Sequence, residues 1–265
     1  MTTSQILDRI ENAKALDFGT IFNQSIELFK KVWVQGLVLL LLNIVLAIPI
    51  FMIVYIPIVI LGLATAFTLD STTDFSGSYG GAGMSVILVL FLIVVYLFLI
   101  IAMSTLALGL RASFYRICQF KDLNELGKED YLYFFKKPYL GKTMKLASAV
   151  ILISVVASML CFFPLIYAIV PLSFMTVVYA FNPDLSVSDI VKVSFNLGNK
   201  KWLISFGLII ISAFLAGIFG FLMCGIGIYI TASLSYLPSY FIYKDVVGFD
   251  DNNDQLKRIE QLTIE

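Results

Sequence analysis

The side chains that could do chemistry in this sequence are carboxylates, hydroxyls, phenols, thiols and basic groups, because the chain contains no histidine. The absence of histidine excludes Ser-His-Asp and Cys-His catalysis, zinc sites of the HExxH type and histidine-ligated haem. The three cysteines, Cys118, Cys161 and Cys224, are far apart and form no CxxC motif, and an odd number predicts no disulfide framework. We therefore predict no enzyme, no cofactor, and no catalytic, cofactor-binding or metal-binding residue.

A glycine-rich stretch, GSYGGAG at Gly77–Gly83, is the segment most like a phosphate-binding loop. A phosphate-binding loop follows a strand and ends in Lys-Ser or Lys-Thr. This stretch follows no predicted strand and has no such ending. We interpret it as a flexible linker.

Basic and aromatic residues are mixed in YRICQFKDLNELGKEDYLYFFKKPYLGK, which runs from Tyr115 to Lys142. At a membrane surface each basic residue contributes roughly 1 kcal/mol of attraction to anionic lipids. The simpler alternative is an ordinary positively charged cytoplasmic loop. The residues predicted to contact anionic lipid are Arg111, Arg116, Lys136, Lys137, Lys142 and Lys145.

One nine-residue pattern, S-x-x-L-x-x-K-x-W, occurs at Ser25–Trp33 and again at Ser194–Trp202, and it contains both tryptophans of the chain. Lysine and tryptophan are favoured where a helix passes through the headgroup region. We interpret each copy as a short surface helix that turns at this Lys/Trp belt and enters the bilayer. The predicted anchors are Lys31, Trp33, Lys200, Lys201 and Trp202. The pattern indicates either an internal duplication or the general tendency of such helices to place lysine before tryptophan.

The second copy of the pattern resembles a motif of bacterial multi-pass membrane proteins, a group that includes the membrane domain attached to some glycerophosphodiester phosphodiesterases. The matching residues are Ser194, Leu197, Gly198, Asn199, Lys201 and Trp202, with a partial match at Ser25, Leu28 and Trp33. The resemblance implies a membrane domain built from helical hairpins. It does not carry the phosphodiesterase activity, because the sequence has neither that catalytic barrel nor its acid/histidine cluster.

The composition predicts a membrane protein. Hydrophobic residues make up 60% of the 265 residues and charged residues only 14%, against roughly 25% charged residues in soluble domains. A soluble fold of this length could not hide so much apolar surface from water. The net charge is zero, so nothing attracts the chain to nucleic acid.

Long uncharged stretches predict six transmembrane helices in three hairpins, since a crossing needs about 20 apolar residues. The stretches are 36–67, 84–110, 146–181 read as two crossings, and 202–243 read as two crossings. All 18 Lys and Arg residues then lie on one side, which the positive-inside rule assigns to the cytoplasm together with both termini. A version in which 146–181 makes a single crossing, to give five spans, or forms a re-entrant segment is the main alternative.

This topology divides the chain into seven segments, all predicted to belong to an all-α integral membrane protein. They are a cytoplasmic amphipathic segment 1–32, a hairpin 33–110 with an outer loop 69–83, a basic aromatic cytoplasmic loop 111–145, a hairpin 146–182, an interfacial amphipathic helix 183–201, a hairpin 202–243 and a cytoplasmic tail 244–265. Ser186 and Asp189 predict an N-cap of the interfacial helix. Gly198-Asn199 predicts its end.

The predicted function is a non-enzymatic structural or accessory role in the inner (cytoplasmic) membrane. The expected partners are membrane lipids, or another membrane protein that this chain would organise. The alternatives are an uncoupled transporter or flippase for a neutral or lipid-like substrate, and a membrane-embedded lipid enzyme. The predicted spans contain no Asp, Glu, Lys or Arg, which disfavours ion coupling.

Overall fold

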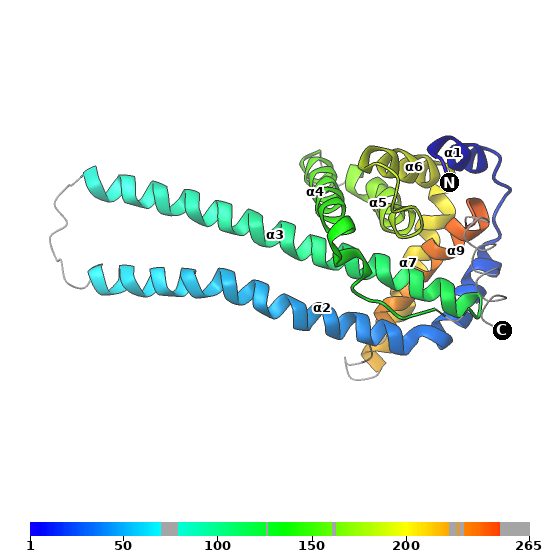
Figure 1. Ribbon diagram of the computed structural model, residues 1–265, viewed down its shortest axis with the longest axis horizontal. Coiled ribbons are helices and arrows are strands. Elements are labelled where there is room, and N and C mark those ends of the chain that lie inside the picture. Colours follow the sequence, from blue (N-terminus) through cyan, green and yellow to red (C-terminus); the bar gives the residue numbers. More distant parts are fainter. Residues whose placement is uncertain (70–78, 126, 161–162, 223–226, 228–230, 250–265) are drawn as a thin grey trace.

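The computed structural model describes residues 1–69, 79–125, 127–160, 163–222, 227 and 231–249, and its regular elements are helical (Figure 1). The longer helices are α2 (Phe18–Leu69), α3 (Tyr79–Asp122), α4 (Lys137–Met159), α5 (Phe163–Phe181) and α7 (Trp202–Leu222). The shorter elements are α1 (Thr3–Glu11), η1 (Tyr133–Phe135), α6 (Val187–Lys200), η2 (Ala232–Tyr236) and α9 (Leu237–Val246). The five longer helices are long and apolar enough to cross a membrane. The chain is an all-α multi-pass membrane protein.

Helices α2 and α3 form a long hairpin that extends from the rest of the molecule (Figure 1). The 52 residues of α2 correspond to about 78 Å, far more than the roughly 30 Å of a hydrocarbon core. Large apolar side chains are exposed on both helices of the extended part, between 41 and 60 and between 86 and 98. Such a surface requires lipid or another apolar environment.

The N-terminal copy of the repeated pattern differs from its prediction. We expected the chain to turn at Lys31 and Trp33, but α2 runs through both without a break. Neither proline nor glycine lies between Lys31 and Trp33, and α2 also continues through Pro49 and Pro57 further along. The second copy does contain a break, because α6 ends at Lys200 and α7 begins at Trp202.

The hairpin predicted within 146–182 is formed by α4 and α5, but its turn lies at a different position. We expected the reversal near 164–171, whereas α4 ends at Met159 and α5 begins at Phe163. Pro171 lies inside α5. The cytoplasmic loop predicted at 111–145 is largely helical as well, because α3 continues to Asp122 and α4 begins at Lys137.

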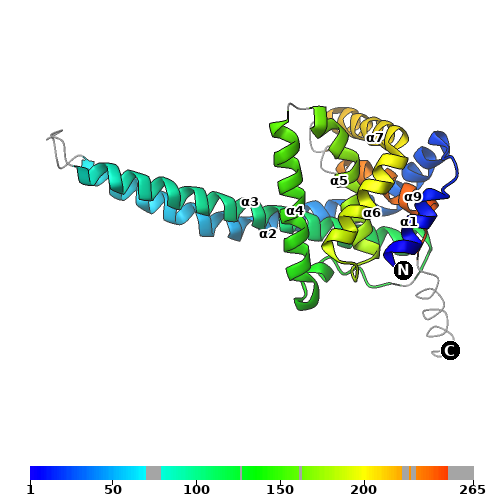
Figure 2. The same ribbon diagram turned by 90° about the horizontal axis from the view of Figure 1, so that it is seen from above.

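The return from the third predicted hairpin is shorter than a full crossing in the part that the structure describes. Its expected turn at 223–227 lies almost entirely outside the described residues. After it, η2 and α9 run back beside α7, and α9 is buried on most of its sides. Figure 2 also shows α4 running across the long hairpin. Helices that cross in this way cannot all follow the normal of one flat bilayer, so the count of six spans stays a prediction.

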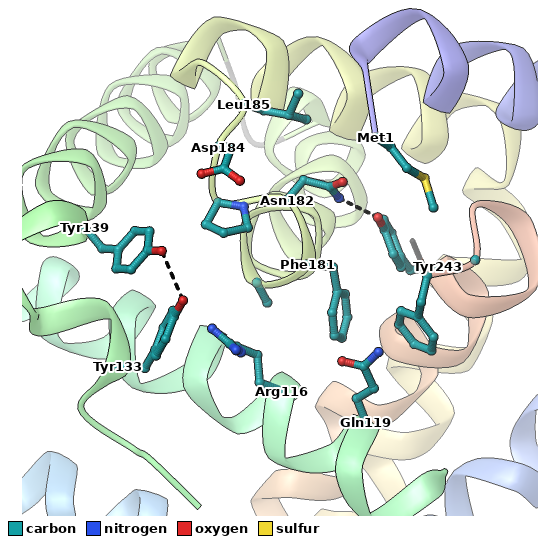
Figure 3. A pocket seen from close by; sticks show the side chains of 14 residues that line it. Met1, Arg116, Gln119, Tyr133, Tyr139, Phe181, Asn182, Asp184, Leu185 and Tyr243 are labelled. Carbon is teal, nitrogen blue, oxygen red and sulfur yellow. Dashed lines mark hydrogen bonds between the residues drawn. The ribbon is translucent and has the colours of Figure 1, made fainter. Parts of the chain in front are cut away.

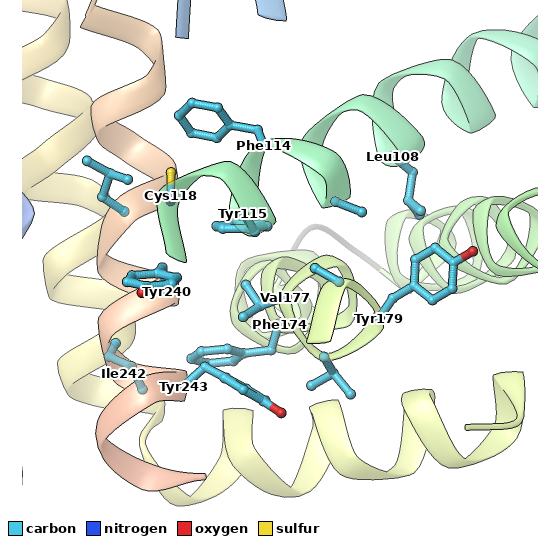
Figure 4. Close-up of a cluster of buried hydrophobic side chains, with 14 of the residues drawn as sticks. Leu108, Phe114, Tyr115, Cys118, Phe174, Val177, Tyr179, Tyr240, Ile242 and Tyr243 are labelled. Atoms are coloured by element: carbon cyan, nitrogen blue, oxygen red, sulfur yellow. The ribbon is translucent and has the colours of Figure 1, made fainter. Parts of the chain in front are cut away.

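The core lies where the N-terminal half of α2 and the C-terminal end of α3 meet α5, α6 and α9. Figure 4 shows the part of this core formed by α3, α5 and α9. Its largest fully buried side chains are aromatic, and Figure 4 labels five of them, Phe114, Phe174, Tyr179, Tyr240 and Tyr243. Where the alternative is exposure to water, burying a large apolar side chain contributes about 1.5–3 kcal/mol. Helix α1 packs on α6 through Ile6 and Ile10. This core holds several helix ends in fixed positions.

Hydroxyl groups in the apolar helices mostly bond to their own backbone. Ser25, Thr105, Ser113, Ser154 and Ser194 each donate to the carbonyl oxygen four residues earlier, at 2.7–3.1 Å. This pattern satisfies a hydroxyl in an apolar environment. It supports a role in helix structure rather than in lining a polar path.

Candidate functional site

The two tryptophans of the repeated pattern lie in different surroundings. Trp33 is 43% exposed on α2. Trp202 is half-buried; its Nε1 donates to the carbonyl of Tyr167 at 3.1 Å, and its ring stacks on Phe206. The two copies are therefore not equivalent in packing.

The predicted lysine anchors also divide into two kinds. Lys31 and Lys200 are exposed. The Nζ atom of Lys201 donates to the carbonyl of Lys14 at 2.6 Å and so ties the start of α7 to the segment that precedes α2. An anchoring role for these residues and the tryptophans stays a prediction.

Four of the six basic residues predicted to contact lipid are exposed. Arg111 lies on α3 with its guanidinium 4.8 Å from the ring centroid of Tyr236, and Lys136 pairs with Asp130 at 2.5 Å. Lys137 and Lys145 are exposed on α4. These four remain available to lipid.

The other two basic residues are turned toward the protein. Lys142 donates to the carbonyl of Pro183 at 2.5 Å. Arg116 is half-buried and lines a pocket. The six predicted residues thus fall into an exposed group and an inward-facing pair. The pair, Arg116 and Lys142, lies near the connection between α5 and α6.

The pocket has a volume of about 340 Å³ and is built from the ends of several helices (Figure 3). Arg116 and Gln119 come from α3, Tyr133 from η1 and Tyr139 from the first turn of α4. The remaining walls are Met1, the chain from Ala180 to Leu185, Tyr243, Gly248 and Phe249. The pocket therefore lies where helices end, rather than halfway along a span.

On one wall Arg116 and two tyrosines form a contact group. The guanidinium carbon of Arg116 lies 3.7 Å from the ring centroid of Tyr133, and the hydroxyl of Tyr133 donates to that of Tyr139 at 3.0 Å. Burial raises the pKa of Tyr133, but once Tyr133 is ionised its phenolate can accept from the hydroxyl of Tyr139 and lies beside Arg116; these two effects outweigh burial, so its pKa lies below the ordinary value. The cation therefore makes this wall electropositive.

The opposite wall is formed by the Asn-Pro-Asp turn that ends α5. The Nδ2 atom of Asn182 donates to the hydroxyl of Tyr243 at 2.5 Å and to the carbonyl of Val178 at 3.3 Å, which fixes the amide. Phe181 stacks on Tyr243 with ring centroids 5.3 Å apart. Asp184 is exposed and places a carboxylate at the pocket.

Sequence reasoning missed most of this site. Arg116 was predicted to contact lipid, whereas Gln119, Asn182, Asp184 and Tyr243 were not singled out. A signal was present in Asn182-Pro183-Asp184, because such residues mark a turn, here directly after an apolar run. What the turn faces could not be read from it.

The arrangement places charged and hydrogen-bonding side chains around one pocket, which suits the binding of a polar ligand. A guanidinium stays protonated in proteins, and the pocket holds one carboxylate, that of Asp184. Among the described residues, no group of three or more acidic or cysteine side chains could hold a metal ion.

No protein family model, curated protein or solved structure matches this chain, so its assignment rests on this geometry.

Proposed function

We propose that this protein is a non-enzymatic accessory protein of the inner membrane that binds and organises lipid along its cytoplasmic face. The observation that carries the proposal is an apolar groove of about 610 Å³ between the long hairpin and α4. Its walls include Leu46 and Ile50 of α2, Phe98 and Ala102 of α3, and Leu140 and Met144 of α4. Walls of this kind suit an acyl chain, which has no hydrogen-bonding group to satisfy.

The groove continues the exposed apolar surface of the long hairpin. Ile50 and Phe98 line it and also lie within the two stretches of exposed apolar side chains. Leu140 and Met144 on the other wall are 43% and 50% exposed. A lipid in contact with the hairpin could therefore insert a chain here without crossing a polar barrier.

A basic residue at the start of α4 supports a headgroup contact at this groove. Residues three and four apart share a helix face, so Lys137 lies on the face of α4 that carries Leu140 and Met144. Lys137 is exposed. An ammonium group above an acyl-chain groove favours lipids with an anionic phosphate.

Filling the groove is the test of this function. Ala102→Trp places an indole in the groove, and Ala213→Trp places one on an exposed face of α7 as the matched control. After purification in mild detergent, native mass spectrometry should find several-fold less bound lipid on Ala102→Trp than on Ala213→Trp. Equal lipid retention by the two variants would contradict the proposal.

The proposed orientation places the outer loop outside the cell and the segment between α3 and α4 in the cytoplasm. In a background without the three native cysteines, a cysteine replacing Ser76, which lies outside the described residues, is expected to react with an impermeant maleimide in intact cells. A cysteine replacing the exposed Lys128 should react only after lysis. The physical reason is that every basic residue lies on the proposed cytoplasmic side. Labelling of Lys128→Cys in intact cells would reverse or refute this orientation.

A further inference from the structure

The polar pocket carries opposite charges from different parts of the chain. Figure 3 shows Arg116, from α3, and Asp184, from the turn after α5, on opposite sides of the space that the pocket residues surround. In the described part of the chain, the ion pairs involve neither of these two residues. A ligand that bears both charges could neutralise the two walls at once.

Arg116 is positioned to bind an anion. Its guanidinium lies over the ring of Tyr133 at 3.7 Å and also interacts with the hydroxyl of that tyrosine; a guanidinium has five N–H donors, so further donors along its edge are left for a ligand. The geometry of that edge matches two oxygens of a phosphate or carboxylate. Because the stack holds the side chain in place, little conformational entropy remains to be lost on binding.

The opposite wall is suited to an amine. The carboxylate of Asp184 is an acceptor, and the stacked rings of Phe181 and Tyr243 line the same pocket. Aromatic faces attract cations. The amide of Asn182 is held by its bonds to Tyr243 and Val178, so this wall is ordered before a ligand arrives.

The size and place of the pocket limit the ligand further. Its volume of about 340 Å³ is at the small end of the roughly 300–1,000 Å³ found for ligand pockets. It lies at helix ends on the side that the charge distribution assigns to the cytoplasm. A compact molecule fits these limits, either as the headgroup of a membrane lipid or as a free metabolite.

We propose that this pocket binds a compact zwitterion of the phosphoethanolamine type, with its phosphate at Arg116 and its primary amine at Asp184. If the zwitterion is a lipid headgroup, the inference rests on the proposed lipid-binding function and specifies the lipid. If the zwitterion is free, the pocket is a second site that is independent of the groove.

The first experiment measures binding of free phosphoethanolamine to the full chain in detergent by isothermal titration calorimetry. Arg116→Gln should weaken binding by at least about tenfold, because a charged, two-pronged hydrogen bond is lost. Arg111→Gln is the matched control, since it removes an exposed arginine from the same helix outside the pocket. It should leave the affinity unchanged.

The amine contact is tested with a ligand that lacks the amine. The parent protein should prefer phosphoethanolamine to ethyl phosphate, and Asp184→Asn should remove this preference while ethyl phosphate still binds. If Asp184→Asn keeps the preference, or if Arg111→Gln weakens binding as much as Arg116→Gln, the proposed binding mode is wrong. A melting curve confirms folding; should Arg116→Gln fail to fold, Arg116→Lys keeps the charge and should show a smaller loss of affinity.

Nanodiscs distinguish the two sources of the zwitterion. With phosphatidylethanolamine and phosphatidylglycerol in equal amounts, retention of phosphatidylethanolamine that is lost in Arg116→Gln identifies a lipid headgroup. Binding of free phosphoethanolamine without this lipid effect identifies a free zwitterion. If neither is observed, the proposal is overturned. Ala102→Trp should bind phosphoethanolamine normally, so failure of the groove and failure of the pocket give separate results.

Discussion

Replacing Gly198 by alanine is expected to destabilise the protein by about 1–3 kcal/mol, the usual cost of overpacking a tight contact. A Cβ atom at this position would lie 2.8 Å from Cγ of Pro171 and 3.0 Å from its Cα atom. Backbone atoms of α5 cannot move aside as the end of a flexible side chain can, so α6 would have to separate from α5. Thermal unfolding in detergent, followed by size-exclusion chromatography, would detect the loss.

Two other helical glycines provide matched controls for this prediction. A Cβ atom at Gly141 or Gly217 would meet nothing within 4 Å. Alanine at either position should be neutral or stabilising, because alanine in a helix is favoured over glycine by about 0.5–1 kcal/mol. If Gly198→Ala and Gly217→Ala have the same melting temperature, close approach of α5 and α6 is not the reason for a glycine at 198.

Lys244→Met is expected to destabilise the protein by about 2–3 kcal/mol, somewhat less than the 3–5 kcal/mol for breaking a fully buried ion pair. Lys244 pairs at 2.5 Å with Asp122, whose side chain is only 16% exposed. The same carboxylate oxygen accepts from the hydroxyl of Tyr240 at 2.8 Å. Removing the lysine leaves the mostly buried carboxylate of Asp122, at the junction of α3 and α9, with the hydrogen bond from Tyr240 but without its cation.

An exposed ion pair with the same Nζ–Oδ2 distance is the control. Lys136 and Asp130 are also 2.5 Å apart, but their side chains are 58% and 36% exposed. Lys136→Met should change the stability by no more than about 0.5 kcal/mol, because water screens and solvates both charges. Combining Lys244→Met with Asp122→Asn should restore part of the lost stability, since no buried charge then remains. Equal effects of the two lysine variants would show that burial does not govern these pairs.

The two ends of α6 show which local sequence patterns predict the structure and which do not. In the sequence Gly198 predicts the end of a helix, because glycine commonly follows a helix C-terminus. In the structure α6 continues to Lys200, and Gly198 is buried against Pro171. The cap predicted at the other end of this helix is confirmed, since the side chain of Ser186 accepts from the backbone N–H of Asp189 at 3.1 Å. A cap depends on neighbours in sequence, whereas a close helix contact depends on a residue from another helix.

Membrane character and helical class were predictable from the sequence alone, because they follow from composition and from the lengths of uncharged stretches. The pairing of helices within 146–181 was also predictable, from the basic residues on both flanks, but the position of its turn was not. The continuity of α2 through Trp33 and the extension of α3 to Asp122 were not, because where a helix ends is decided by small local preferences that packing can override. The polar pocket belongs entirely to the tertiary structure. Arg116, Asp184 and Tyr243 come from three separate segments, and only the packing of α3, α5 and α9 in the core brings their side chains to one cavity. Periodicity and motif spacing describe residues that are close in sequence, so they carry no information about which helix ends meet.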